Sequence, residues 1–301
     1  MSEMSGPPFR ADHVGSLLRP PELLRAREEH QAGRLSAEKL RRVEDQAIRD
    51  VARMQQEIGF QGVTDGEFRR GSWHMDFLYQ IAGVTKTDQT LRIQFRSEAG
   101  PVEAALGAFR IGRRLSLDRT IFAEDFAYLN DPAQRAYVTS IGGDGDKQHL
   151  TNIRLINQAL AGKPAGMTVC THMCRGNFRS SWVAEGGYDH VAEALFGELA
   201  VDGFFLEYDD ARSGGFAPLR FVPCGKKRVV LGLVTSKRPT LESKDELKRR
   251  IDEATKYVPL EQLCLSPQCG FSSTVDGNAL TIEEEQAKLR LVVETAREVW
   301  G

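Results

Sequence analysis

RVVLGLVTS, at residues 228–236, is a short and almost wholly apolar run. The segment KDELKRRIDEATKYV follows it at residues 244–258, with apolar side chains at three- and four-residue spacing, and this spacing predicts a helix. An apolar strand bounded by helices, without alternation of apolar and polar residues, is typical of a parallel sheet covered on both faces. The run therefore indicates an α/β fold.

The same alternation of strand and helix continues on both sides of this run. Helices are expected at residues 36–59, 188–200, 244–258 and 281–300. Strands are expected near residues 11, 62, 168, 204, 231 and 263. No G-x-G-x-x-G follows the first strand and no G-x-x-x-x-G-K-[ST] occurs, which disfavours a nucleotide-binding sheet. We therefore expect residues 1–301 to form a single domain with the TIM-type (β/α)8 barrel fold.

The middle of the chain fits the alternation poorly. Residues 85–100 (TKTDQTLRIQFRSEAG) suggest an antiparallel excursion, and residues 130–160 read as two helices around a glycine turn. RLSLDR, at residues 114–119, is a weak seventh strand. The barrel is therefore expected to be complete or to lack one or two βα units here.

The composition is that of an ordinary globular protein. Hydrophobic residues make up 41% of the chain, charged residues 27%, and the net charge is −2. No positive excess favours nucleic acid or a membrane surface as a partner. The sequence has no export signal and no long apolar segment, and its five cysteines are an odd number, so we expect a cytoplasmic protein with reduced thiols.

Metal-ligating side chains recur at the ends of the predicted strands. His172 and Cys174 close GMTVCTHMC and project to the same side, Glu207 ends the apolar run GFFL, and Cys269 follows LEQLCLS. The carboxyl ends of parallel barrel strands converge on one face, so these side chains are expected to meet. One nitrogen, two sulfurs and one oxygen suit tetrahedral zinc.

Each of these residues also has an ordinary structural explanation. Glu207 fits a solvated strand-end acid, Cys269 a turn cysteine, and His172 a core histidine bonded to backbone. Cys170 and Cys264 lie inside their strands and are expected to be core residues.

Five segments resemble a known family. THMCRGNF (171–178), FFLEYDD (204–210) and LSPQCGF (265–271), with ADHVGSLLRP (11–20) and GVTDGEFRRG (62–71), resemble the catalytic domain of cobalamin-independent methionine synthase, particularly its short single-barrel relatives. The resemblance implies zinc-dependent transfer of a methyl group to a thiol, most plausibly homocysteine, in the biosynthesis of methionine. It also implies the zinc ligands His172, Cys174, Glu207 and Cys269. The amino acid part of homocysteine is expected to contact Gly15, Ser16 and Glu67.

The chain departs from this family at two places. The position of a histidine proton donor corresponds to Val234, which puts a folate methyl donor in doubt and leaves a methyl-cobalamin protein as the alternative. Between residues 109 and 131 two family motifs are unrecognisable, with Asp118 a poor stand-in, so βα units are expected to be missing.

Other functions remain open. A thiol alkyltransferase of the epoxyalkane:coenzyme M type would anchor an anionic thiol through Arg175 and Arg179, which with Asn177 are expected on the rim of the site. A catalytically impaired homologue would bind zinc or thiol without turnover. A zinc hydrolase is disfavoured because four protein ligands leave no open position for water. His13 and Arg19 flank the Gly15–Ser16 loop, where substrate contact, helix capping and surface exposure are equally good explanations.

Overall fold

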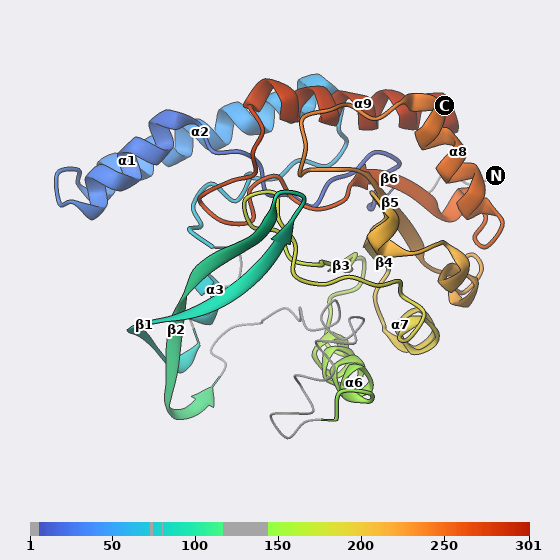
Figure 1. The fold of residues 1–301 in the computed structure, drawn as a ribbon, viewed down its shortest axis with the longest axis horizontal. Helices are drawn as coiled ribbons and strands as arrows, with labels where there is room; N and C mark the ends of the chain where they lie inside the picture. The colour runs from blue at the N-terminus through green and yellow to red at the C-terminus, as the bar shows by residue number, and fades with distance from the viewer. Residues whose placement is uncertain (1–5, 73–74, 80, 117–143) are drawn as a thin grey trace.

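The computed structural model describes residues 6–72, 75–79, 81–116 and 144–301, and these form an α/β structure (Figure 1). The helices are α1 (Pro21–Gln31), α2 (Ala37–Ile58), α3 (Met75–Leu78), α6 (Gln148–Leu160), α7 (Ala192–Glu198), α8 (Lys244–Thr255) and α9 (Ile282–Trp300). The strands are β1 (Ala82–Ser97), β2 (Gly100–Ser116), β3 (Cys170–Met173), β4 (Gly203–Glu207), β5 (Arg228–Val234) and β6 (Leu263–Pro267).

A parallel sheet with the order β3-β4-β5-β6 lies at the centre of the fold. Every residue of β5 and β6 is buried, because both faces of these strands are covered. The strand expected near residue 11 is a single parallel bridge between Ala11 and Leu265. The described residues thus confirm a parallel α/β sheet, and they do not show a closed barrel.

The prediction of a strand near residue 62 is wrong, because residues 60–64 form no strand. The amide side chain of Gln55 accepts a hydrogen bond from the Thr64 backbone N–H at 2.9 Å and donates one to the Thr64 carbonyl at 2.9 Å. Both backbone groups that a strand partner would engage are therefore occupied by a side chain of α2.

The helices follow the local signals of the sequence. Ser36 caps α2 by accepting from the Lys39 N–H, and Gly59 ends it in the left-handed conformation. Thr281 and Glu284 form a capping box at the start of α9. In Figure 1, α2, α9 and α8 follow one another along one edge of the molecule, with α6 and α7 on the opposite edge. The helix α1 was not predicted, and it begins with proline at its first position.

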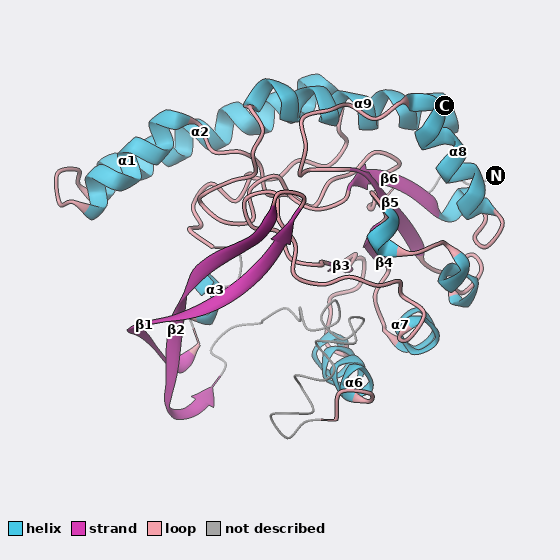
Figure 2. Cartoon of the chain, in the orientation of Figure 1, coloured by secondary structure: helices cyan, strands magenta, loops and turns pink. Residues whose placement is uncertain are grey.

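The hairpin β1–β2 is the antiparallel excursion expected from residues 85–100 (Figure 2). It contacts the loop after β3 through a small core in which Phe95 and Ala104 pack against Val183. Two backbone hydrogen bonds, of 2.6 and 2.8 Å, join Arg96 to Trp182. The hairpin tip is thereby held beside the segment that carries Cys174. The first of the two helices predicted between residues 130 and 160 falls outside the described residues, as does Asp118, and the second is α6.

Candidate metal centre

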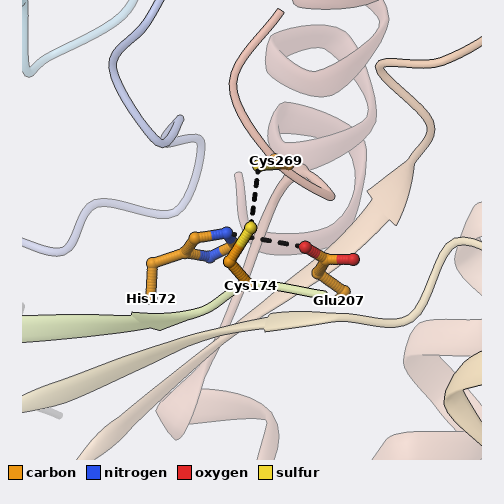
Figure 3. A group of neighbouring side chains, drawn as sticks. All are labelled: His172, Cys174, Glu207 and Cys269. Carbon is orange, nitrogen blue, oxygen red and sulfur yellow. Dashed lines mark hydrogen bonds and ion pairs between the residues drawn. The ribbon is translucent and has the colours of Figure 1, made fainter. Parts of the chain in front are cut away.

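The structure brings together His172, Cys174, Glu207 and Cys269 (Figure 3). One ligand atom from each residue lies within 4.8 Å of the other three. His172 belongs to β3 and Cys174 follows it, Glu207 is the last residue of β4, and Cys269 comes just after β6. The convergence of parallel strand ends therefore brings together residues that are far apart in sequence.

The strand between β4 and β6 contributes no ligand to this cluster. Gly232 of β5 pairs with Glu207 on one side and Ser266 on the other. A Cβ atom at this position would lie 2.6 Å from the Leu206 carbonyl oxygen and 2.7 Å from the Gln268 Cα atom. The absence of a side chain lets the ends of β4 and β6 approach one another closely.

The four side chains point toward one another rather than toward separate partners. Figure 3 marks the Cys174 and Cys269 Sγ atoms, 3.7 Å apart, and the His172 Nε2 and Glu207 Oε1 atoms, 3.6 Å apart. The His172 Nδ1 atom lies 3.2 Å from the Phe205 carbonyl oxygen, so the tautomer that donates there leaves Nε2 with a free lone pair. His172 Nε2 and Glu207 Oε2 are both buried without a hydrogen-bond partner. A buried acceptor pair of this kind is what a metal ion would satisfy.

The electrostatics of the cluster are those of crowded anionic ligands. Burial raises the pKa of Glu207, and the charge of Lys237 opposes this change. The hydrogen bond between the two thiols raises the pKa of Cys174 and lowers that of Cys269. Burial lowers the pKa of His172, but the neighbouring Cys269 and Glu207 outweigh burial and the net direction is upward. Without a cation the cluster therefore retains protons that a divalent ion would displace.

A second layer of hydrogen bonds holds Glu207. The Arg175 backbone N–H donates to Glu207 Oε1 at 3.0 Å, and the Glu207 N–H donates to the Tyr188 hydroxyl at 2.9 Å. The Arg175 guanidinium donates to the Tyr188 hydroxyl at 2.9 Å and to the Glu207 carbonyl at 3.0 Å. Arg175 is thus a buried support of the cluster.

The prediction that Arg175 and Asn177 lie on the rim is wrong. Both are buried, and Asn177 donates through Nδ2 to the Gly270 carbonyl at 2.6 Å. Their side chains donate to buried backbone carbonyls, those of Gly186 and Glu207 for Arg175 and that of Gly270 for Asn177. Arg179 is exposed and pairs with Asp276 at 2.5 Å.

Lys237 was not foreseen as part of the site. Its Nζ atom donates to the Gln268 side chain at 3.2 Å, and no carboxylate forms an ion pair with it among the described residues. Its charge nevertheless favours the ionised forms of Glu207, Cys174 and Cys269. The available signal was its position just beyond β5, where strand ends line the site.

The three residues expected to contact an amino acid lie beside the cluster. The Thr64 hydroxyl donates to the Gly15 carbonyl at 2.8 Å, and the Leu17 N–H donates to the Gly66 carbonyl at 3.1 Å, which joins the Gly15–Ser16 loop to the turn that carries Glu67. A Cβ atom on Gly270, next to Cys269, would fall 1.8 Å from the Ser16 Oγ atom.

Glu67 has one oxygen available for a ligand. Its Oε1 atom lies 3.0 Å from Arg70, whereas Oε2 is buried without a partner. Its backbone is in the left-handed region, with φ of 59°, which is unusual for a residue other than glycine. Burial raises its pKa, and Arg70 and Arg19 oppose this change.

A pocket of about 250 Å³ opens between the hairpin tip and the strand ends. Four cationic side chains line it, namely Arg179, Arg212, Lys237 and Arg238, against the two acids Glu98 and Asp210. Trp182 also lines the pocket and stacks on Arg212, whose guanidinium carbon lies 4.0 Å from the ring centroid. The pocket therefore offers an aromatic face and four cationic groups, of which Lys237 alone has no ion-pair partner among the described residues.

The remaining sequence predictions concern residues away from the cluster. Cys264 is a core residue as predicted, Cys170 is only half-buried, and Cys224 is exposed. Val234 is fully buried at the end of β5. Within the described part of the chain, no helix has the length and apolarity needed to cross a bilayer.

Comparison with known proteins agrees with the sequence resemblance. Residues 150–298 match the family model described as "Cobalamin-independent synthase, Catalytic domain". The uncharacterized proteins YxjH and YxjG of Bacillus subtilis (strain 168) are 40% and 39% identical to this chain, aligning with 97% and 98% of it and with 95% of each relative. A crystal structure from Listeria monocytogenes, provisionally described as a vitamin-B12 independent methionine synthase, has a TM-score of 0.71 at 33% identity, covering 98% of both chains.

The chain is shorter than its relative within the shared region. The alignment with YxjH runs over 358 positions and this chain has 301 residues, so at least 57 positions face no residue of this chain. The matched residues include β3 to β6 and all four side chains of the cluster. The chain belongs to the family of proteins that share the catalytic domain of the cobalamin-independent synthases.

Proposed function

We propose that this protein transfers a methyl group to the thiol of homocysteine with zinc as its cofactor. The observation that carries the proposal is the convergence of one imidazole, two thiols and one carboxylate within 4.8 Å. Membership of the family of the cobalamin-independent synthases and the provisional description of the Listeria protein as a methionine synthase support it.

The donor set of the cluster fits zinc. His172, Cys174, Glu207 and Cys269 would hold the ion, since nitrogen and sulfur ligands with one carboxylate are a common tetrahedral set. The buried atoms His172 Nε2 and Glu207 Oε2 have no hydrogen-bond partner among the described residues and are therefore available to a metal ion. Bound zinc would supply a deprotonated, nucleophilic thiolate at neutral pH.

The chain's own residues would orient the two substrates. Glu67, through its unpartnered Oε2 atom, would accept a hydrogen bond from the substrate ammonium, with the Gly15–Ser16 loop beside it. Glu207 is the ligand best suited to yield to an incoming sulfur, because a carboxylate is a harder ligand than a thiolate and the Arg175 N–H and Lys237 stabilise its charge.

We place the methyl donor in the basic pocket between the hairpin tip and the strand ends. Trp182 and the four cations suit a flat ring system or a group with negative charge. Val234 offers no proton, so a donor whose leaving group must be protonated would depend on another acid, and Lys237, which lines the pocket, is a candidate.

The proposal is tested by methyl transfer assays on the zinc-loaded protein. Homocysteine is supplied with 5-methyltetrahydrofolate, and in parallel with methylcobalamin, and methionine is measured by mass spectrometry. We expect methionine from at least one donor, abolished by chelation of zinc and in Cys174→Ala. A protein that retains one zinc but methylates no homocysteine with either donor would contradict the proposal.

The basic pocket also favours a second candidate, the alkylation of an anionic thiol. In that case 2-mercaptoethanesulfonate would replace homocysteine as the acceptor. The KM for 2-mercaptoethanesulfonate would then rise in Arg179→Gln and not in Glu67→Gln. Assays of both variants with both thiols distinguish the two functions.

A further inference from the structure

Arg19 is a buried arginine that binds the backbone of two separate loops. It is 5% exposed. Through Nη1 it donates to the Ser272 carbonyl at 3.1 Å, the Ser272 hydroxyl at 2.5 Å and the Thr274 carbonyl at 3.0 Å. Through Nη2 it donates to the Glu67 carbonyl at 3.1 Å and the Arg70 carbonyl at 2.9 Å. One guanidinium thus connects the turn at residues 65–71 with the loop at residues 269–275.

These two loops carry the two ends of the proposed substrate site. The turn at residues 65–71 contains Glu67, and the loop at residues 269–275 begins with Cys269. They also contact each other directly, since the Val275 N–H donates to the Gly71 carbonyl at 2.9 Å and the next residue, Ser72, pairs with Thr274. Arg19 adds a second connection through its guanidinium group.

The bonding pattern of Arg19 is directional rather than a simple ion pair. No carboxylate lies within ion-pair distance of its guanidinium among the described residues, and all five acceptors are neutral oxygens. Burial lowers its pKa to about 10, with the nearby acids Glu67, Asp76 and Asp65 opposing the change, so the group remains charged at neutral pH. A rigid planar fork can meet acceptors on two sides at fixed angles, whereas a lysine ammonium cannot.

We propose that Arg19 is a positioning residue that fixes the separation between Glu67 and the metal cluster, and thereby selects thiols that carry an ammonium group. The proposal rests on the function proposed above. A thiol must reach the cluster with its sulfur while its ammonium meets Glu67, so the span between the two loops determines which acceptor fits. Glu67 itself is held in an unfavourable left-handed conformation, which requires an external restraint such as the bond from Arg19 to its carbonyl.

The test compares two thiols that differ only in the amine. Homocysteine and 4-mercaptobutyrate are titrated calorimetrically into the zinc-loaded wild-type protein and into Arg19→Lys, with zinc content measured for both proteins. Wild type is expected to prefer homocysteine. Arg19→Lys is expected to lose about tenfold or more in affinity for homocysteine, to bind 4-mercaptobutyrate within about twofold of wild type, and to retain one zinc.

Arg228→Lys is the matched control. Arg228 is also a buried arginine and donates to the carbonyls of Gly6, at 2.7 Å, and Pro8, but it lies at the start of β5, far along the strand from the cluster. Its replacement is expected to leave the thiol preference unchanged. Ser272→Ala, which removes one acceptor of Arg19 and leaves its charge, is expected to weaken homocysteine binding about two- to fivefold. If Arg19→Lys does not fold, Ser272→Ala is the variant that tests the inference.

Three results would overturn the inference. The first is that Arg19→Lys or Ser272→Ala keeps the wild-type preference for homocysteine. The second is that either variant lowers the affinity for both thiols equally. The third is that Arg228→Lys changes the preference as much as Arg19→Lys does. Failure of the wild-type protein to bind either thiol would instead contradict the proposed function and remove the basis of the inference with it.

Discussion

The Sγ atoms of Cys174 and Cys269 lie 3.7 Å apart, although 95 positions separate the two residues in sequence. Each follows a strand of the parallel sheet, and the pair is bounded by His172 and Glu207. Close, buried thiols with unequal pKa values share a proton when no cation is present.

This proximity predicts that zinc protects the pair from oxidation. In the metal-free protein, the lowered pKa of Cys269 makes it the nucleophile toward a mild oxidant, and Cys174 is the nearest thiol to trap the product. Oxidised glutathione should yield a Cys174–Cys269 disulfide, detected by peptide mass spectrometry, and stoichiometric zinc should suppress it. The Cys224→Ala variant removes the exposed thiol as a competing site. Free Cys174 and Cys269 after oxidation of the metal-free protein would contradict this prediction.

Removal of the Tyr188 hydroxyl should weaken the support of Glu207. In Tyr188→Phe the buried Arg175 guanidinium and the Glu207 N–H both lose an acceptor at 2.9 Å. We expect a loss of about 1–3 kcal/mol in the free energy of unfolding and a zinc affinity about 10 to 100 times lower. Chemical denaturation and a competitive chelator assay measure the two quantities. Tyr257→Phe, at an exposed tyrosine, should change neither, and equal effects in the two variants would argue against this role for Tyr188.

Lys237 should affect the second substrate and not the retention of metal. The variant Lys237→Gln removes a positive charge from the pocket, while zinc binding should persist because a neighbouring cation opposes the binding of another cation. We expect about one zinc per chain, a KM for the methyl donor raised about tenfold, and an unchanged KM for homocysteine. Arg238→Gln, at the exposed side of the same pocket, should have a smaller effect. Loss of zinc in Lys237→Gln would refute the assignment.

Glu285 should make stability depend on pH. It is 1% exposed, its carboxylate accepts a hydrogen bond from the Leu18 N–H at 2.7 Å, and burial raises its pKa from 4.5 to about 8. The folded protein thus binds this proton more tightly than the unfolded chain. The stabilisation is complete below pH 4.5 and is lost as pH rises toward about 8, by about 1.4 kcal/mol per pH unit at most.

The variant Glu285→Gln should remove this dependence, because the amide keeps an acceptor for Leu18 without a charge. Urea denaturation at pH 5.5 and pH 8 should show that the advantage of the variant over wild type grows with pH. A constant difference between the two proteins would mean that Glu285 does not titrate in this range.

Much of the sheet and the membership of the cluster could be predicted from the sequence. Ser36 and Gly59 marked the ends of α2 because capping depends on local chemistry. The grouping of Glu207 with His172 followed from parallel strands, whose carboxyl ends must share one face whatever the loop lengths. Both depended on rules that hold without knowledge of distant packing.

Other features depended on contacts that no local pattern encodes. The strand near residue 62 is absent because Gln55, on the preceding helix, binds both backbone groups of Thr64. The burial of Arg175 depends on Tyr188 and the Glu207 carbonyl, and that of Arg19 on carbonyls at residues 272 and 274. An arginine in a sequence is predicted to be exposed, because its hydrogen-bond acceptors become known only from the tertiary fold.

The zinc K-edge X-ray absorption spectrum of the zinc-loaded protein, with and without homocysteine, tests the central claim most directly. The account predicts two sulfur neighbours at about 2.3 Å and two nitrogen or oxygen neighbours at about 2.0 Å, and a third sulfur in place of the Glu207 oxygen once the thiol is added. A first shell without two cysteine sulfurs, or one that homocysteine leaves unchanged, would contradict it.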